Sequence, residues 1–206
     1  MGKLLITSGG YLDGQRGLEL DKRIEELSAG KRVLIVTNAT STGSNIKGVP
    51  IIKNNFQQIA DMVDLIHLTE ENIKQIKKYD VLYITGGDMA PLGEIVTEKI
   101  KDYLINFLSN GGIIIGESAG SIIFGEDFKW YYDIKKGTKP KYDVKLSSYK
   151  GFGFIEENIY PHYNKASEQQ KTKIEKYEEQ TNTTITKMND GEWVEEIFLN
   201  NNIEQL

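Results

Sequence analysis

One short segment of the sequence has the residue types and spacing of a catalytic nucleophile. Residues 116–120, GESAG, follow three isoleucines and precede another apolar run. A serine between two glycines in this setting predicts a sharp turn from a strand into a helix, with the Ser118 hydroxyl exposed at the turn. The N–H of Ala119 and the start of the helix would then stabilise a negatively charged oxygen. The alternative is a tight structural joint in which Ser118 only caps the helix.

A glycine pair at 86–87 ends the predicted strand one crossover earlier. A neighbouring strand-end loop usually supplies the second N–H of an oxyanion hole. We expect Gly87 to supply it, because a side chain at that position would block the approach of a substrate carbonyl. The alternative is an ordinary loop glycine with a positive φ angle.

A serine nucleophile needs a base, and the chain has two histidines. His162 follows Pro161 in a loop-like segment, whereas His67 lies on a predicted buried strand and is expected to be structural. His162 is therefore the candidate base, with an ordinary loop histidine as the alternative. A carboxylate must orient the imidazole, and the sequence offers two candidates. Asp190 lies in the turn NDGEW, and Asp133 lies between the serine and the histidine, in the chain order Ser–acid–His of many hydrolases.

The elements that must position these residues alternate between short apolar strands and longer amphipathic helices. Strands are expected at 3–8, 32–38, 63–68, 80–87 and 113–117, and helices at 18–30, 49–63, 69–79, 90–112 and from the GESAG turn onward. The strands are nearly continuous apolar runs, which is typical of a parallel sheet covered by helices on both faces. We therefore predict a doubly wound α/β fold whose strand ends gather the glycine-rich loops at one edge.

The pattern loosens after residue 126. The remaining elements are expected as loops or a hairpin at 127–151, a strand or loop pair at 151–164, a helix at 166–181 and antiparallel edge strands within 183–206. No segment has the composition of a linker, so residues 1–206 are expected to form a single α/β hydrolytic domain.

Composition limits the function classes. A net charge of −5 without a basic patch argues against nucleic acid or an anionic membrane as a partner. The chain has no cysteine, which excludes disulfides and thiolate chemistry, and its two histidines lie in different settings, so neither a metal nor a cofactor is expected. No apolar run is long enough for a membrane span and no signal peptide is recognisable, so a cytoplasmic location is expected.

Four motifs in order along the chain resemble a known family. They are YITGGDMAPL at 83–92, GGIIIGESAGS at 111–121, GFGFI with YPHYN within 151–164, and MNDGEW at 188–193. Together they resemble the peptidase E (aspartyl dipeptidase) family, of which cyanophycinase is a relative. The resemblance implies a fold like that of class I glutamine amidotransferases: a flavodoxin-like, mostly parallel sheet with a serine in place of the nucleophilic cysteine.

The resemblance also implies the roles of the site residues. Ser118 would be the nucleophile and His162 the base, and Gly87 and Ala119 would form the oxyanion hole. The acid of the family is usually a glutamate in a turn, and Asp190 falls at that position. Glu192 is a less well-aligned substitute.

Two further positions come from the same resemblance. Asp133 falls on a second carboxylate that has been considered for the triad, and we rank it below Asp190. The family's aspartyl preference requires an arginine that holds the substrate carboxylate. Gln170 falls at the arginine position, flanked by Lys171 and Lys173. A lysine cannot provide the bidentate clamp of an arginine, so aspartyl specificity is not inferred.

The leading hypothesis is a serine peptidase that hydrolyses short peptides through an acyl-enzyme, as a monomer or homodimer. A catalytically weak or inactive protein that binds peptides or small molecules on the same fold is the second hypothesis, because the acid and the arginine of the family are both replaced. A nucleotide-binding α/β protein is the third. The glycine pairs in TSGG and TGGD are weak phosphate-loop signals, but neither GxGxxG nor GK[ST] is present.

Overall fold

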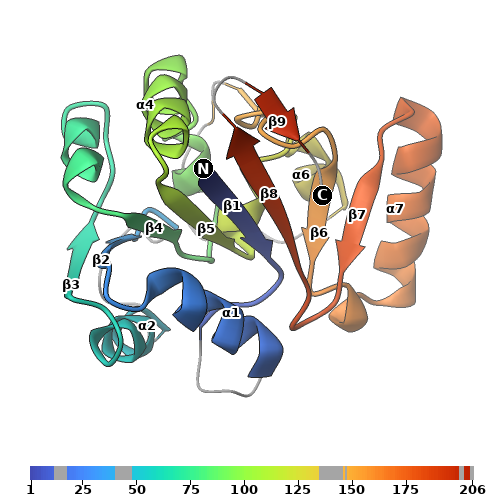
Figure 1. Cartoon of the computed structure of the whole chain (residues 1–206). Coiled ribbons are helices and arrows are strands. Elements are labelled where there is room, and N and C mark those ends of the chain that lie inside the picture. The colour runs from blue at the N-terminus through green and yellow to red at the C-terminus, as the bar shows by residue number, and fades with distance from the viewer. Residues whose placement is uncertain (12–17, 40–47, 135–145, 147, 200–201, 205–206) are drawn as a thin grey trace.

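The computed structural model describes residues 1–11, 18–39, 48–134, 146, 148–199 and 202–204. A seven-stranded sheet forms its centre (Figure 1). The strands are β1 (Gly2–Thr7), β2 (Arg32–Val36), β3 (Met62–Ile66), β4 (Val81–Ile84), β5 (Ile113–Glu117), β8 (Trp193–Leu199) and β9 (Asn202–Glu204). Their order across the sheet is β3-β2-β4-β5-β1-β8-β9.

The strand directions confirm the predicted fold class. The five strands from β3 to β1 are parallel, whereas β8 runs antiparallel to β1 and β9 antiparallel to β8. In the registers, Ile84 of β4 lies beside Gly116 of β5, and Thr7 of β1 lies beside Glu117. The carboxyl ends of these three strands are therefore level at one edge, and the loops that follow them come together there.

Helices cover both faces of the sheet. α1 (Leu18–Ser28) and α2 (Gly48–Gln57) pack on one face, against the side chains of Ile113 and Ile115. α4 (Glu98–Ser109) packs on the other face, where Ile114 points. Successive residues of β5 thus enter opposite cores, which explains why its sequence is a continuous apolar run instead of an alternating one.

A second, two-stranded sheet corrects the expectation for the C-terminal region. β6 (Asn158–Pro161) and β7 (Ile185–Met188) pair in parallel, so β7 is not an antiparallel edge strand of the main sheet. α7 (Glu168–Thr181) connects them and lies along their outer side (Figure 1). A helix that joins two neighbouring strands makes a crossover, and a crossover makes the strands parallel. The expected antiparallel pattern holds for β8 and β9.

Two expected helices differ in detail, and a helix forms where loops or a hairpin were expected. The segment predicted as one helix at 90–112 forms α3 (Met89–Gly93) and α4, because Thr97 caps a new helix by accepting a hydrogen bond from the Ile100 N–H. The segment at 69–79 forms a 3₁₀ helix, η2 (Ile73–Lys78). The polar segment after residue 126 contains α6 (Lys129–Ile134), while residues 135–145 and 147 of that segment lie outside the described residues.

The expectation of a buried strand at 63–68 was wrong. β3 is the edge strand of the sheet and is only half-buried, and His67, just after it, is exposed. Within the part of the chain that the structure describes, no helix has the length and apolar character needed to cross a membrane.

Candidate active site

The GESAG segment forms a strained turn between β5 and the short helix α5 (Ala119–Ile122). Ser118 has φ 50° and ψ −110°, a backbone conformation that residues with side chains rarely adopt. Glycines on either side make the turn possible. A Cβ at Gly116 would lie 2.7 Å from the carbonyl oxygen of Gly120, and a Cβ at Gly120 would lie 2.3 Å from that of Ile84.

The Ser118 side chain makes no capping hydrogen bond to α5. Its Oγ instead lies 3.0 Å from Nε2 of His162. The turn is held by Ser121, whose Oγ is 2.8 Å from the Thr7 carbonyl oxygen and 2.7 Å from that of Gly116, and accepts a hydrogen bond from the Thr7 N–H. The Ser118 side chain is therefore oriented toward the imidazole. It does not act as a cap of α5.

His162 lies at the carboxyl end of β6 and begins the 3₁₀ turn η3 (Tyr163–Lys165). Its backbone is left-handed, with φ 60° and ψ 35°. The backbone N–H of His162 donates a 2.8 Å hydrogen bond to Oγ of Ser8, and Ser8 Oγ lies 3.2 Å from the carbonyl oxygen of Met188. Ser8, which directly follows β1, therefore holds the backbone of His162 in position. The sequence pattern predicts that the strand end at residues 8–10 lies at this edge of the sheet, but it predicts no role for Ser8 itself.

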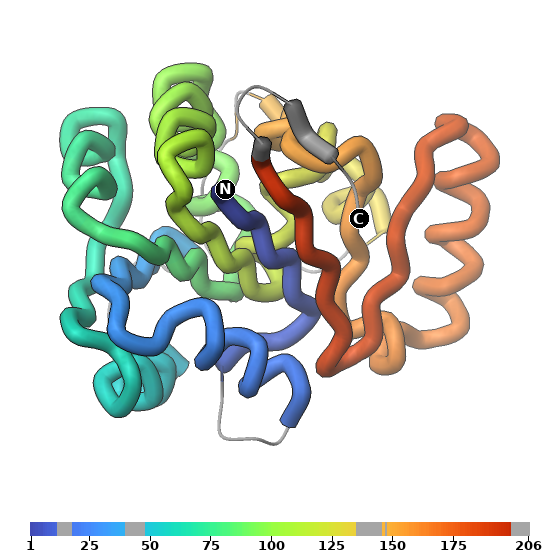
Figure 2. The backbone as a smooth tube through the Cα atoms, in the orientation of Figure 1, coloured from blue at the N-terminus to red at the C-terminus, as the bar shows by residue number. Residues whose placement is uncertain are grey.

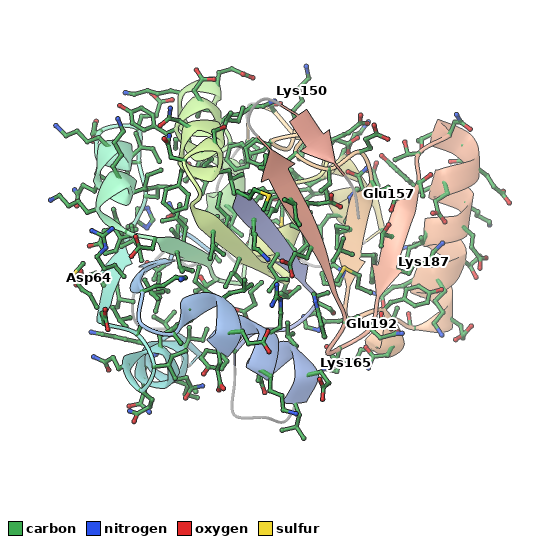
Figure 3. All side chains as sticks on the ribbon, viewed as in Figure 1. Asp64, Lys150, Glu157, Lys165, Lys187 and Glu192 are labelled. Carbon is green, nitrogen blue, oxygen red and sulfur yellow. The ribbon has the colours of Figure 1, made fainter. Side chains whose placement is uncertain are left out.

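Asp190 is the carboxylate at the other side of the imidazole. Its Oδ1 is hydrogen-bonded to Nδ1 of His162, and its Oδ2 lies 2.5 Å from Nζ of Lys165. The Asp190 N–H donates to Oδ1 of Asn164, so η3 and the β7–β8 turn are tied together. Figure 2 shows the chain after β6 and the turn between β7 and β8 meeting at one edge of the molecule. Lys165 and Glu192 also lie at this edge (Figure 3).

The electrostatics of Asp190 favour its ionised form. Burial alone would raise the pKa of this carboxyl, but the hydrogen bonds from Lys165 and His162 outweigh burial and lower the pKa of Asp190 to about 2. A neutral His162 ring that donates from Nδ1 to this carboxylate presents the lone pair of Nε2 to the Ser118 hydroxyl. Lys165 and Asn164 carry no local sequence signal, because their contacts with Asp190 join segments 25 and 26 residues apart.

The two other carboxylates considered for the triad lie elsewhere. Asp133 is exposed on α6. Burial raises the pKa of Tyr177 of α7, and the charge of Asp133 is among the further causes that raise this pKa. The carboxylate of Glu192 accepts hydrogen bonds from the backbone and side-chain N–H groups of Asn189, so it stabilises the turn that carries Asp190. The structure thus brings Asp190, and neither of the alternatives, to Nδ1 of His162.

Gly87 and Ala119 line the same cavity as Ser118 and His162. Gly87 has φ 146°, and a Cβ there would lie 2.6 Å from the carbonyl oxygen of Ala39. Contact with the neighbouring loop therefore already requires glycine at this position, before any substrate is considered. α5 is only four residues long, so its dipole is small, and stabilisation of an oxyanion would depend on individual N–H groups.

Gln170 has a role in its own helix. Its side-chain oxygen accepts a hydrogen bond from the Ser167 N–H, and its own N–H donates to Ser167 Oγ, which together form the capping box that begins α7. The flanking cations are engaged as well, since Lys171 pairs with Glu168 and Lys173 donates to the carbonyl oxygen of Ile134. Gln170 therefore has a structural role, which is to cap the start of α7.

A cavity of about 40 Å³ adjoins the Ser118 hydroxyl. It is lined by Gly87, Ser118, Ala119, Ile122, Trp130, Tyr131, Tyr160, Pro161 and His162. Two larger hollows lie away from these residues, one near Arg32 and Asp80 at the opposite edge of the sheet, and one between α1 and α2. We assign the chemistry to the small cavity, because it alone of the three contains the Ser118–His162 pair. Across the described ranges, no group of three or more acidic or histidine side chains could hold a metal ion.

Comparison with known proteins decides the family. The model of peptidase family S51 matches residues 4–198. The chain belongs to peptidase family S51. As a member of this family it is a serine-type peptidase, a hydrolase of the peptidase E kind.

Solved structures agree on the fold of this S51 peptidase. A candidate peptidase E protein from Listeria monocytogenes superposes with a TM-score of 0.71 at 20% identity, covering 100% of this chain and 99% of its own. A peptidase from an acI-B1 actinobacterium superposes with a TM-score of 0.63 at 17% identity, covering 100% of this chain and 94% of its own. No curated protein matches the chain at a significant level.

Proposed function

We propose that this S51 peptidase hydrolyses short peptides, in the manner of a dipeptidase, through Ser118, His162 and Asp190. The observation that carries the proposal is the continuous set of contacts from Ser118 Oγ to His162 Nε2 at 3.0 Å, and from His162 Nδ1 to Asp190. A Ser118 Oγ well beyond hydrogen-bond reach of His162 would have favoured the binding hypothesis, so the distance of 3.0 Å favours turnover. Membership of a peptidase family argues against the nucleotide-binding hypothesis.

The proposed reaction has two halves. In the first, Ser118 Oγ bonds to the substrate carbonyl carbon while its proton passes to Nε2 of His162. The oxyanion is stabilised by the N–H groups of Gly87 and Ala119. The C–N bond then breaks, and His162 gives its proton to the leaving amine.

In the second half, water attacks the acyl group on Ser118 and gives a proton to His162. The tetrahedral intermediate collapses, the Ser118 oxygen regains its proton from His162, and the free acid leaves. Asp190 stays ionised throughout and stabilises the imidazolium that forms in both halves.

Active-site labelling tests the proposal. A fluorophosphonate probe should form an adduct on Ser118 in the folded protein, and Ser118→Ala should lose both the adduct and the hydrolysis of a dipeptide panel. Ser148→Ala is the matched control, because Ser148 is exposed and its Oγ accepts only a local hydrogen bond from the Lys150 N–H among the contacts described. Unchanged turnover in Ser118→Ala would overturn the proposal.

A further inference from the structure

The cavity beside Ser118 has a distinct chemical character. Its side-chain walls are formed mainly by Ile122 of α5, by Trp130 and Tyr131 of α6 and by Tyr160 of β6. Its volume of about 40 Å³ is far smaller than the 370 Å³ and 420 Å³ of the two hollows that lie elsewhere. The cavity therefore fits a side chain of a few heavy atoms.

The walls of the cavity are firmly packed. Trp130 is fully buried and Ile122 is 1% exposed. The Trp130 ring lies 5.4 Å from the ring of Tyr160 and 6.0 Å from that of Tyr131, measured between centroids. Side chains packed in this way resist displacement, so a larger group cannot enter without a cost in packing.

No lysine or arginine is found among the described residues that line the cavity. Asp88 follows Gly87 in the chain, and its carboxylate accepts a hydrogen bond from the Ala90 N–H. Burial is the main cause that raises the pKa values of Tyr131 and Tyr132, and the charge of Asp88 raises these pKa values further.

We propose that this cavity receives the side chain of the residue whose carbonyl Ser118 attacks, and that it selects short, uncharged side chains over acidic and long ones. An acidic side chain would lose its hydration, meet no cation on the described wall and be repelled by Asp88. A long side chain would exceed the space bounded by Trp130 and Ile122. This inference rests on the proposed function, because it concerns the acyl side of the same reaction.

A panel of dipeptides X-Ala, with X as Ala, Asn, Asp or Leu, tests both parts of the selection. Asn and Asp have nearly the same shape, so their ratio of kcat/KM isolates charge, whereas the ratio of Ala to Leu isolates size. We expect kcat/KM for Asn-Ala to exceed that for Asp-Ala by at least about tenfold, and that for Ala-Ala to exceed that for Leu-Ala by a similar factor. Faster turnover of Asp-Ala than of Asn-Ala, or of Leu-Ala than of Ala-Ala, overturns the inference.

Variants of the wall residues test whether the cavity causes the preference for short side chains. Trp130→Phe enlarges the cavity and should lower the Ala-to-Leu ratio severalfold. Ile122→Val removes one methyl group and should move the ratio in the same direction by less, and it provides the test if Trp130→Phe does not fold. Trp193→Phe is the matched control, because Trp193 packs against the core on the α1 and α2 side of the sheet and should leave the ratio unchanged.

Asp88→Asn tests the charge. Asparagine is as good a helix cap as aspartate, so α3 should persist while the negative charge is lost. The Asn-to-Asp ratio should fall severalfold in this variant, and an unchanged ratio contradicts the role of Asp88. If Ser118-dependent turnover occurs with the opposite selectivity, only this inference fails. If no member of the panel shows turnover that Ser118→Ala abolishes, the proposed function fails and this inference fails with it.

Discussion

The side-chain oxygen of Ser8 accepts a hydrogen bond of 2.8 Å from the backbone N–H of His162. This contact links the end of the first strand to the candidate base, 154 residues later in the chain. His162 has a left-handed backbone, which a residue with a side chain adopts only when its surroundings hold it there. Ser8 is one of the groups that hold it, so Ser8 should position the imidazole without touching the substrate.

Replacing Ser8 by alanine should therefore reduce kcat more than it changes KM. The His162 N–H would lose its acceptor, a loss of about 1 kcal/mol for a partly buried hydrogen bond, and the ring would no longer be held at Ser118. Steady-state kinetics and thermal unfolding measure the two effects. Ser28→Ala is the control, because Ser28 is fully buried and its Oγ has no hydrogen-bond partner among the described residues. Equal losses of kcat in both variants would contradict a positioning role for Ser8.

The nucleophile turn was predictable because it is a local feature. The close backbone contacts of the turn require glycines two residues away from Ser118 on each side, so the local sequence pattern indicates the turn directly. The parallel core was predictable for a similar reason, since the side chains of the inner strands β1, β2, β4 and β5 enter two cores and are therefore apolar in succession. His162 was favoured over His67 on the sequence alone, but one premise was wrong, because the strand before His67 is a half-exposed edge.

The supports of the site were not predictable from local pattern. Ser8, Asn164 and Lys165 act through contacts that join distant segments, and their residue types are ordinary for loops. The direction of β7 was also misjudged, because alternating polarity does not distinguish a parallel from an antiparallel pair. The amphipathic helix between β6 and β7 contained the missing information, since a helical crossover makes its strands parallel.

Replacing Asp190 by asparagine should reduce kcat on the order of 10⁴-fold, the loss found for this change in a serine protease triad, because the amide favours the wrong tautomer of the imidazole. The fold should persist, since asparagine has nearly the same shape. Asp133→Asn is the matched control on the exposed face of α6 and should behave as the wild type. A large loss of kcat in Asp133→Asn with a small one in Asp190→Asn would reverse the assignment of the acid.

Replacing Lys165 by methionine should change the acid stability of the protein. The pKa of Asp190 is lowered to about 2 in the folded state, with Lys165 among the causes, and is about 4 in an unfolded chain. A lowered folded pKa adds stability above the unfolded pKa, and this stability is lost as the pH falls from about 4 to about 2. Without Lys165 the folded pKa of Asp190 should rise, so this contribution should become smaller at neutral pH.

Urea unfolding between pH 2 and pH 7 measures this effect for Lys165→Met. Lys187→Met is the control, because Lys187 pairs with Glu178 away from Asp190. The wild type and Lys165→Met should differ most at neutral pH and converge near pH 2. A difference that stays constant across this range would show that Lys165 does not act through the ionisation of Asp190.

Replacing Glu196 by glutamine should stabilise the protein at neutral pH. Glu196 is 4% exposed, and its Oε2 is buried without a hydrogen-bond partner among the described residues. Burial raises the pKa of Glu196, and the charge of Glu157 raises it further. A carboxyl whose pKa is higher in the folded than in the unfolded state is more stable in its protonated form in the folded protein. The free energy of unfolding therefore falls as the pH rises through the folded pKa. Glutamine remains neutral and avoids this loss.

The neighbouring residue gives the matched comparison for Glu196→Gln. Glu195 pairs with Arg23 and Lys3, and these hydrogen bonds lower its pKa. Glu195→Gln should therefore lower the melting temperature at pH 7, whereas Glu196→Gln should raise it, by about 2–4 °C for each kcal/mol in a chain of this size. The gain of Glu196→Gln should shrink as the pH is lowered toward 4. A lower melting temperature for Glu196→Gln at pH 7 would show that the ionised carboxylate is stabilised in the fold.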